Sequence, residues 1–123
     1  MSLSNLEALT RVVYGEARGE SDKGKIAVAW TVKNRASKSG KSIAYEATKP
    51  SQFCCYSGEM KETNAKEKCE KIAQETIDGQ NSDPTGGATF FYSGTKVPSW
   101  AKDKDPCAEI GKHKFFKDIA PYK

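Results

Sequence analysis

The segment Tyr14-Gly15-Glu16-Ala17-Arg18-Gly19-Glu20 decides how this chain is interpreted, because it sets a carboxylic acid at the end of an expected amphipathic helix. Three earlier apolar residues share one face of that helix with Glu16, at spacings of three, four and seven residues: Val13, Val12 and Leu9. A carboxyl group on an apolar face loses hydration, which favours its protonated form. A protonated acid can give its proton to a leaving group, so Glu16 is the candidate catalytic acid.

An ordinary helix-end glutamate is the alternative for Glu16, either solvated or paired with Arg18 or Arg35. The neighbouring glycines, Gly15 and Gly19, allow the backbone to turn and another segment to come close. Spacing alone leaves both interpretations open.

Apolar periodicity, capping residues and turn residues divide the chain into helices followed by a β-rich part. Ser4 and Glu7 form a capping-box pattern at the first helix. The expected helices cover residues 5–16, 23–36, a short stretch from Ser42 to before Pro50, and a stretch from a cap at Asn64 to Gly79. After a strong turn at 83–87, strands are expected at 88–92 and 110–116. The predicted fold class is α+β, dominated by helices, with one small antiparallel sheet.

Length and composition predict one globular domain over residues 1–123, with 37% hydrophobic and 29% charged residues. No apolar run approaches the roughly 20 residues of a membrane helix, so we expect no membrane insertion. The net charge is +4, but no basic run interleaved with aromatic residues appears, so no nucleic-acid partner is expected. Met1-Ser2-Leu3-Ser4 has neither the basic nor the apolar part of a signal peptide.

Four cysteines in a small domain are compatible with two disulfides and an extracellular place of action. A bond between the adjacent Cys54 and Cys55 would be strained, which leaves Cys54–Cys69 with Cys55–Cys107, or Cys54–Cys107 with Cys55–Cys69. Four reduced thiols in a cytosolic protein are the alternative. A zinc site is disfavoured, because no C-x-x-C spacing appears and His113 is the only histidine. We expect no metal, and a structural role for His113 on the last strand.

Five motifs follow one another in a fixed order along the chain. They are Tyr14-Gly15-Glu16-Ala17-Arg18-Gly19-Glu20, Asn34-Arg35, Pro50-Ser51-Gln52-Phe53, Asp83-Pro84-Thr85-Gly86-Gly87-Ala88 with Phe91-Tyr92, and Ile110-Gly111-Lys112-His113-Lys114-Phe115-Phe116. In this order they resemble the SleB/CwlJ-type cell wall hydrolase family, the catalytic domain of spore-cortex-lytic enzymes. The resemblance covers about residues 6–116. The four cysteines depart from the pattern of the spore enzymes.

The resemblance implies a lysozyme-like domain that cleaves the β-1,4 bond between N-acetylmuramic acid and N-acetylglucosamine in peptidoglycan, without a cofactor. It assigns the catalytic acid to Glu16 and favours a lytic transglycosylase, which leaves 1,6-anhydro ends. The alternatives are a muramidase-type hydrolase and a non-catalytic wall-binding module. Glu20 is the candidate second carboxylate of a glycosidase pair. Gly19 interrupts the helix before Glu20, so a structural or charge-tuning role is the favoured alternative. A metal-dependent stem peptidase is disfavoured, because there is no H-E-x-x-H motif.

Five residues are candidates for substrate binding: Gln52, Thr85, Gly86, Tyr92 and Trp100. An amide side chain such as that of Gln52 suits an N-acetyl group or a ring hydroxyl. Tyr92 and Trp100 offer flat apolar faces for sugars, and the backbone of the turn at 85–86 can contact a glycan.

The expected partner is the peptidoglycan glycan strand, bound by a monomer. The expected place of action is extracellular or cell-wall associated. A secreted, disulfide-stabilised relative that attacks another organism's wall fits these features, and so does a phage lysin.

Overall fold

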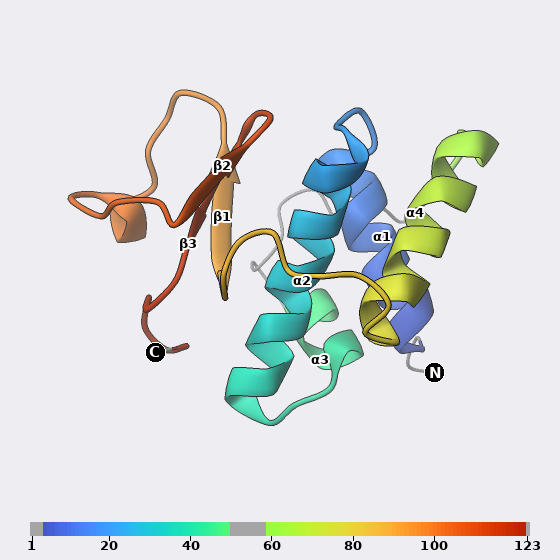
Figure 1. Cartoon of the computed structure of the whole chain (residues 1–123), viewed down its shortest axis with the longest axis horizontal. Helices are drawn as coiled ribbons and strands as arrows, with labels where there is room; N and C mark the ends of the chain where they lie inside the picture. The colour runs from blue at the N-terminus through green and yellow to red at the C-terminus, as the bar shows by residue number, and fades with distance from the viewer. Residues whose placement is uncertain (1–3, 50–58, 123) are drawn as a thin grey trace.

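The computed structural model describes residues 4–49 and 59–122, which fold into a group of helices beside a small antiparallel sheet (Figure 1). The elements are α1 (Asn5–Ala17), α2 (Asp22–Ser39), α3 (Ile43–Thr48), α4 (Thr63–Ile77), β1 (Phe90–Ser93), the 3-10 turn η1 (Ser99–Ala101), β2 (Ala108–Ile110) and β3 (His113–Phe116). In Figure 1, α2 lies between the sheet and the pair α1 and α4. The predicted helix-dominated α+β fold is confirmed. None of the described helices is long and apolar enough to cross a membrane.

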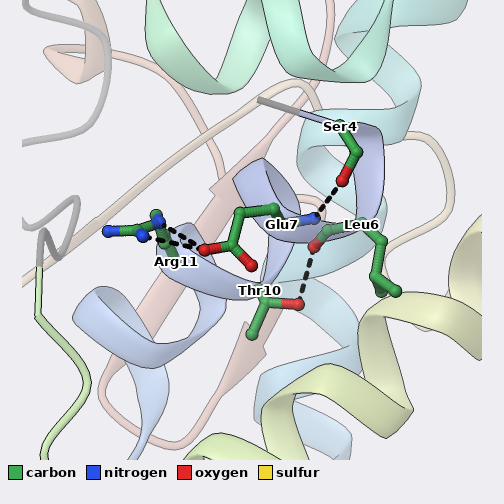
Figure 2. A network of polar contacts seen from close by, with 5 residues as sticks. All are labelled: Ser4, Leu6, Glu7, Thr10 and Arg11. Carbon is green, nitrogen blue, oxygen red and sulfur yellow. Dashed lines mark hydrogen bonds and ion pairs between the residues drawn. The ribbon is translucent and has the colours of Figure 1, made fainter. Parts of the chain in front are cut away.

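Serine side chains begin the first three helices, because a hydroxyl can satisfy one of the N–H groups that a helix start leaves unbonded. Ser4, Ser21 and Ser42 each accept a hydrogen bond from the backbone N–H three residues later, at 3.1, 3.2 and 2.9 Å. Figure 2 shows the first of these caps: Ser4 binds the N–H of Glu7, but the Glu7 carboxylate turns along the helix to Arg11 at 2.8 Å. Only the serine half of the predicted capping box is therefore formed.

The main core lies among the four helices and one face of the sheet. Leu9, Val12 and Val13 of α1 and Val28 and Val32 of α2 are completely buried in it. Each such side chain contributes about 1.5–3 kcal/mol relative to an exposed one. Because α2 contacts helices on one side and the sheet on the other, it carries buried residues on most of its faces.

The sheet has the order β1-β3-β2, with both pairs antiparallel. The sequence predicted one strand over 110–116, and the structure corrects this to a hairpin in which Ile110 pairs with His113. Gly111 makes the turn with a φ of 59°, a left-handed conformation that glycine adopts without steric cost. The hairpin tip thereby places Lys112 and His113 beside the end of α1.

A hydrogen-bonded turn at 83–88 fastens the chain before β1 to α2. The Asp83 carboxylate accepts hydrogen bonds from the N–H and hydroxyl of Thr85 at 2.8 and 2.6 Å, from the N–H of Gly87 at 2.9 Å, and from the Asn34 amide at 2.9 Å. Asn34 also donates to the carbonyl of Ala88 at 2.9 Å. Burial acts to raise the pKa of Asp83, but these hydrogen bonds outweigh it and lower the pKa below its usual value.

Candidate active site

A cleft of about 280 Å³ opens where the end of α1 meets the tip of the β2–β3 hairpin. One wall is the whole segment 15–20, and the other consists of Ser93, Lys112 and His113. The segment 15–20 leaves the helix at this point, because α1 ends at Ala17 and the N–H of Glu20 bonds to the carbonyl of Ala17 at 2.9 Å. Residues more than 70 positions apart in the chain therefore share one concave surface.

Glu16 lies in the last turn of α1 and lines this cleft. The apolar residues on its helix face, Val12 and Val13, are fully buried, whereas Glu16 itself is half-buried. This placement sets Glu16 next to buried apolar residues of its own helix and also in the lining of the cleft. A general acid needs both, because it must hold a proton and also reach a substrate oxygen.

Glu20 lines the same cleft, but its carboxylate is already engaged by the hairpin. Its Oε1 atom accepts a hydrogen bond from the N–H of Lys112 at 2.9 Å, and its side chain is only 13% exposed. The α1 helix does not continue to Glu20, so the four-residue helical spacing from Glu16 does not apply. The contacts of Glu20 are those of a residue that holds the loop after α1 against the hairpin.

His113 lies behind Glu20 and is 3% exposed. Its Nδ1 atom is 3.7 Å from Oε1 of Glu20, beyond hydrogen-bonding distance, and neither ring nitrogen has a hydrogen-bond partner among the described residues. Burial lowers the pKa of His113, although the charge of Glu20 acts in the opposite direction. The imidazole is therefore neutral near pH 7, and it packs edge-on against the ring of Phe91.

Gly111 has no room for a side chain, because a Cβ atom there would collide with the Glu20 carboxylate. We expect Gly111→Ala to destabilise the fold by about 1–2 kcal/mol more than Gly79→Ala, since Glu20 must give up its hydrogen bond to Lys112 to make space. Gly79 is a matched control, with a φ of +72° and nothing near its Cβ position. Thermal or urea unfolding of both variants measures the difference.

The same comparison in a Glu20→Ala background checks the cause. There the two glycine substitutions should cost the same, because only the left-handed backbone strain remains. An excess cost at Gly111 that persists without the Glu20 side chain would contradict this account of the contact.

Cationic side chains lie at the rim of the cleft. Lys112 is exposed, and Arg18 is about half exposed, with its guanidinium 5.0 Å from the centre of the Tyr14 ring. Arg18 also forms an ion pair with Glu62 at 3.4 Å. The sequence had suggested Arg18 as a partner for Glu16, and it did not identify Lys112 or Ser93 as cleft residues. Gly111 was the sequence signal that could have identified Lys112, because a turn at this glycine places the next residue at the tip of a hairpin.

Tyr92 and Trp100 are not brought to this cleft. Side chains alternate along a strand, so Tyr92 faces away from its neighbour Ser93, which lines the cleft. Tyr92 stacks on Phe116 with ring centres 5.7 Å apart, and Trp100 packs edge-on against the same ring at 5.3 Å. These residues form a second aromatic cluster on the other face of the sheet.

Thr85 and Gly86 belong to the turn that Asp83 organises. The Thr85 side chain is buried, with its hydroxyl bonded to Asp83 and to the N–H of Ala88. Gly86 is exposed, with a φ of 73°. Gln52 lies outside the described residues, and its role stays a prediction, as do those of the other candidate binding residues.

Two of the four cysteines fall within the described residues. Cys69 is a buried free thiol of α4, and Cys107 is an exposed free thiol just before β2. Cys54 and Cys55, their predicted partners, lie outside the described residues. The disulfide pairings therefore stay predictions.

Comparison with known proteins relates this arrangement to enzymes of the bacterial cell wall. The cell wall hydrolase family matches residues 19–116. The chain is 28% identical to the spore cortex-lytic enzymes of Bacillus cereus, over 94% of its length, and of Halalkalibacterium halodurans, over 91%. It spans less than half of these relatives, 45% and 34% of their respective lengths.

Two solved structures share the fold. The catalytic domain of the Bacillus cereus SleB protein superposes with a TM-score of 0.72 at 28% identity, covering 92% of this chain and 89% of that one. The catalytic domain of the germination-specific lytic transglycosylase SleB from Bacillus anthracis gives a TM-score of 0.74 at 26% identity, covering 95% and 97%. The segment with Glu16 precedes the family match but lies at the cleft that the matched hairpin completes. Because the family model matches residues 19–116, the chain belongs to the cell wall hydrolase family.

Proposed function

We propose that this protein cleaves the glycan strands of peptidoglycan at the β-1,4 bond between N-acetylmuramic acid and N-acetylglucosamine. The observation that carries the proposal is the half-buried Glu16 at the edge of a cleft, in a chain of the cell wall hydrolase family. Its relatives are named spore cortex-lytic enzymes, and one solved relative is named a lytic transglycosylase. The place of action is accordingly the cell wall.

In the proposed reaction, protonated Glu16 donates its proton to the glycosidic oxygen as the bond from that oxygen to the muramic acid C1 breaks. Positive charge develops on C1 and the ring oxygen of the muramic acid, while the N-acetylglucosamine leaves with the protonated oxygen. The Glu16 carboxylate then accepts the proton of the muramic acid C6 hydroxyl as its oxygen bonds to C1. This transfer leaves Glu16 protonated again, and the sugar ends as a 1,6-anhydro ring.

The arrangement of the carboxylates favours this route over hydrolysis by a carboxylate pair. Among the described residues of the cleft, Glu16 and Glu20 are the two carboxylates, and Glu20 is committed to the N–H of Lys112. A retaining or inverting glycosidase uses a second carboxylate as nucleophile or to activate water. The C6 hydroxyl needs less help, because it is part of the substrate and already close to C1.

The products of one digest test the proposal. Purified peptidoglycan treated with the protein should release fragments with 1,6-anhydromuramic acid ends, which are lighter than hydrolysed ends by one water molecule. Mass spectrometry distinguishes the two, and reducing muramic acid ends would identify a muramidase instead. If the glycan strands stay intact after prolonged incubation with the unaltered protein, the proposal is overturned. The wall-binding module would then be the remaining interpretation.

A further inference from the structure

A second pocket lies at the opposite end of α2 from the candidate active site. It has a volume of about 150 Å³ and is formed by the end of α2, by α3 with its flanking residues, and by Pro121 and Tyr122 near the C-terminus. The 18 residues of α2 span about 27 Å at the helical rise of 1.5 Å per residue, so this pocket is separate from the cleft at Glu16. The proposed glycan cleavage makes no use of it.

The floor of this pocket is a carboxylate that is fully occupied by internal partners. Glu46 is completely buried, and its two oxygens accept hydrogen bonds from the hydroxyls of Tyr122 and Ser39. The buried Arg35 lies close enough for its charge to interact with Glu46. Glu46 therefore closes the pocket as part of the fold, and the charge of Arg35 offsets its own.

The rim carries three ammonium groups from three separate segments. Lys38 comes from the end of α2, Lys41 from the following loop, and Lys49 from the end of α3. Within the described part of the chain, none of the three forms an ion pair with a carboxylate. Lys49 donates a long hydrogen bond of 3.4 Å to the hydroxyl of Tyr122. The charge of Glu46 acts on both Arg35 and Lys49, so one buried acid stands against four cations, and the three rim ammonium groups create a local field that attracts an anion.

An exposed aromatic ring lies close to two of these lysines. Tyr45 is 47% exposed, and the Nζ atoms of Lys41 and Lys49 lie 5.6 and 5.9 Å from its ring centre. Tyr45 and Val97 are the large hydrophobic side chains with most exposure among the described residues. A flat ring flanked by cations offers a stacking surface for a sugar or peptide group that bears a negative charge.

We propose that this pocket binds an anionic group, a carboxylate or a phosphate, of a cell-wall polymer. The proposal rests on the proposed function only for the identity of the polymer. The volume of the pocket suits a single carboxylate or phosphate group. The polymer chain that carries this group would lie across Tyr45. Bound there, the polymer is held near the protein while the cleft at the other end of α2 engages a glycan strand, which raises the effective concentration of substrate.

The test uses protein in which Glu16→Gln is already present, so that binding is measured without cleavage. In this background Lys38, Lys41 and Lys49 are changed to Gln together, and sedimentation with insoluble purified walls gives the affinity. A matched control changes Lys71, Lys96 and Lys102 to Gln, because these exposed lysines lie outside the pocket and lose the same charge. We expect about tenfold weaker binding for the pocket variant, because it loses three charges that act together at one site. We expect less than a twofold change for the control, because its three lost charges lie outside the pocket.

Two further wall preparations identify the source of the anion. If the tenfold difference disappears on walls stripped of phosphate polymers by hydrofluoric acid, the pocket binds phosphate. If it persists there but disappears on insoluble walls whose carboxylates have been converted to amides with a carbodiimide and ammonia, the pocket binds a peptide carboxylate. Equal binding by the pocket and control variants on intact walls would overturn the proposal. The result stands apart from the glycosidase assignment, because the Glu16→Gln background needs no cleavage.

Discussion

Replacing Glu16 by glutamine is expected to slow wall cleavage by about 10³-fold, because a glutamine amide cannot donate a proton to the glycosidic oxygen. The substitution keeps the size and polarity of the side chain at the edge of the cleft, where Glu16 is half-buried. Release of soluble fragments from purified peptidoglycan measures the rate. Thermal unfolding of the variant should match that of the unaltered protein, which separates a catalytic effect from loss of fold.

Glu20→Gln is the matched control for this prediction. The glutamine carbonyl can still accept the hydrogen bond from the N–H of Lys112, so the hairpin contact survives while the negative charge is lost. We expect less than a tenfold change in rate. A loss at Glu20 as large as that at Glu16 would indicate that both carboxylates take part in the chemistry, and retained activity in Glu16→Gln would remove Glu16 as the acid.

Removing the Asp83 carboxylate is expected to produce the largest loss of stability among the polar residues that we compare. Asp83→Ala deletes the acceptor of four hydrogen bonds, two of them from backbone N–H groups of the turn. Hydrogen bonds to a charged group contribute about 1.5–3 kcal/mol each, but they share one site, so we expect a total of about 3 kcal/mol. Urea unfolding measures it. Asp105→Ala, at an exposed aspartate, should change stability by less than about 0.5 kcal/mol.

The same carboxylate predicts a pH dependence with a definite sign. The pKa of Asp83 is lowered in the folded protein, so the folded state favours the charged form. Its stabilising contribution is present above the unfolded pKa of about 3.9 and is lost as the pH falls through the lower folded value. The stability difference between the unaltered protein and Asp83→Asn should therefore shrink on acidification below about pH 4. A difference that stays constant down to pH 2 would contradict this explanation.

Local signals in the sequence predicted the helices well. The cap at Ser4 and the start of α1 lie as expected, because a serine side chain satisfies the same backbone group wherever the helix packs. The expected cap at Asn64 is wrong, since α4 begins at Thr63 and its N-cap Glu62 makes no side-chain capping hydrogen bond. The second helix was expected to end at Ala36, but it continues to Ser39 and ends at Gly40. The polar residues 37–39 are exposed to solvent, and such residues are compatible with a helix. The helix ends only where Gly40 adopts a left-handed conformation.

Contacts between distant segments were harder to predict. The run 110–116 looked like one strand, because a single glycine within it is a weak turn signal until β1 and β2 are seen pairing with β3. The position of Glu16 followed from helical spacing, whereas the engagement of Glu20 depends on a bond to Lys112, 92 residues later. The sequence also showed no sign that the Thr85 hydroxyl binds Asp83, whose other partner Asn34 lies 49 residues earlier than Asp83.

The hairpin tip has a consequence for how substrate preference changes among proteins of this shape. Ser93, at the end of β1, and Lys112, in the turn before β3, line the cleft, while Phe91 and Phe115 further along β1 and β3 pack against the core. Under the proposed function, substitutions at Ser93 or Lys112 are expected to alter which wall polymers bind, at little cost to folding. Directed evolution confined to positions 93 and 112, with residues 20 and 111 left unaltered as a pair, is a practical route to new wall specificities.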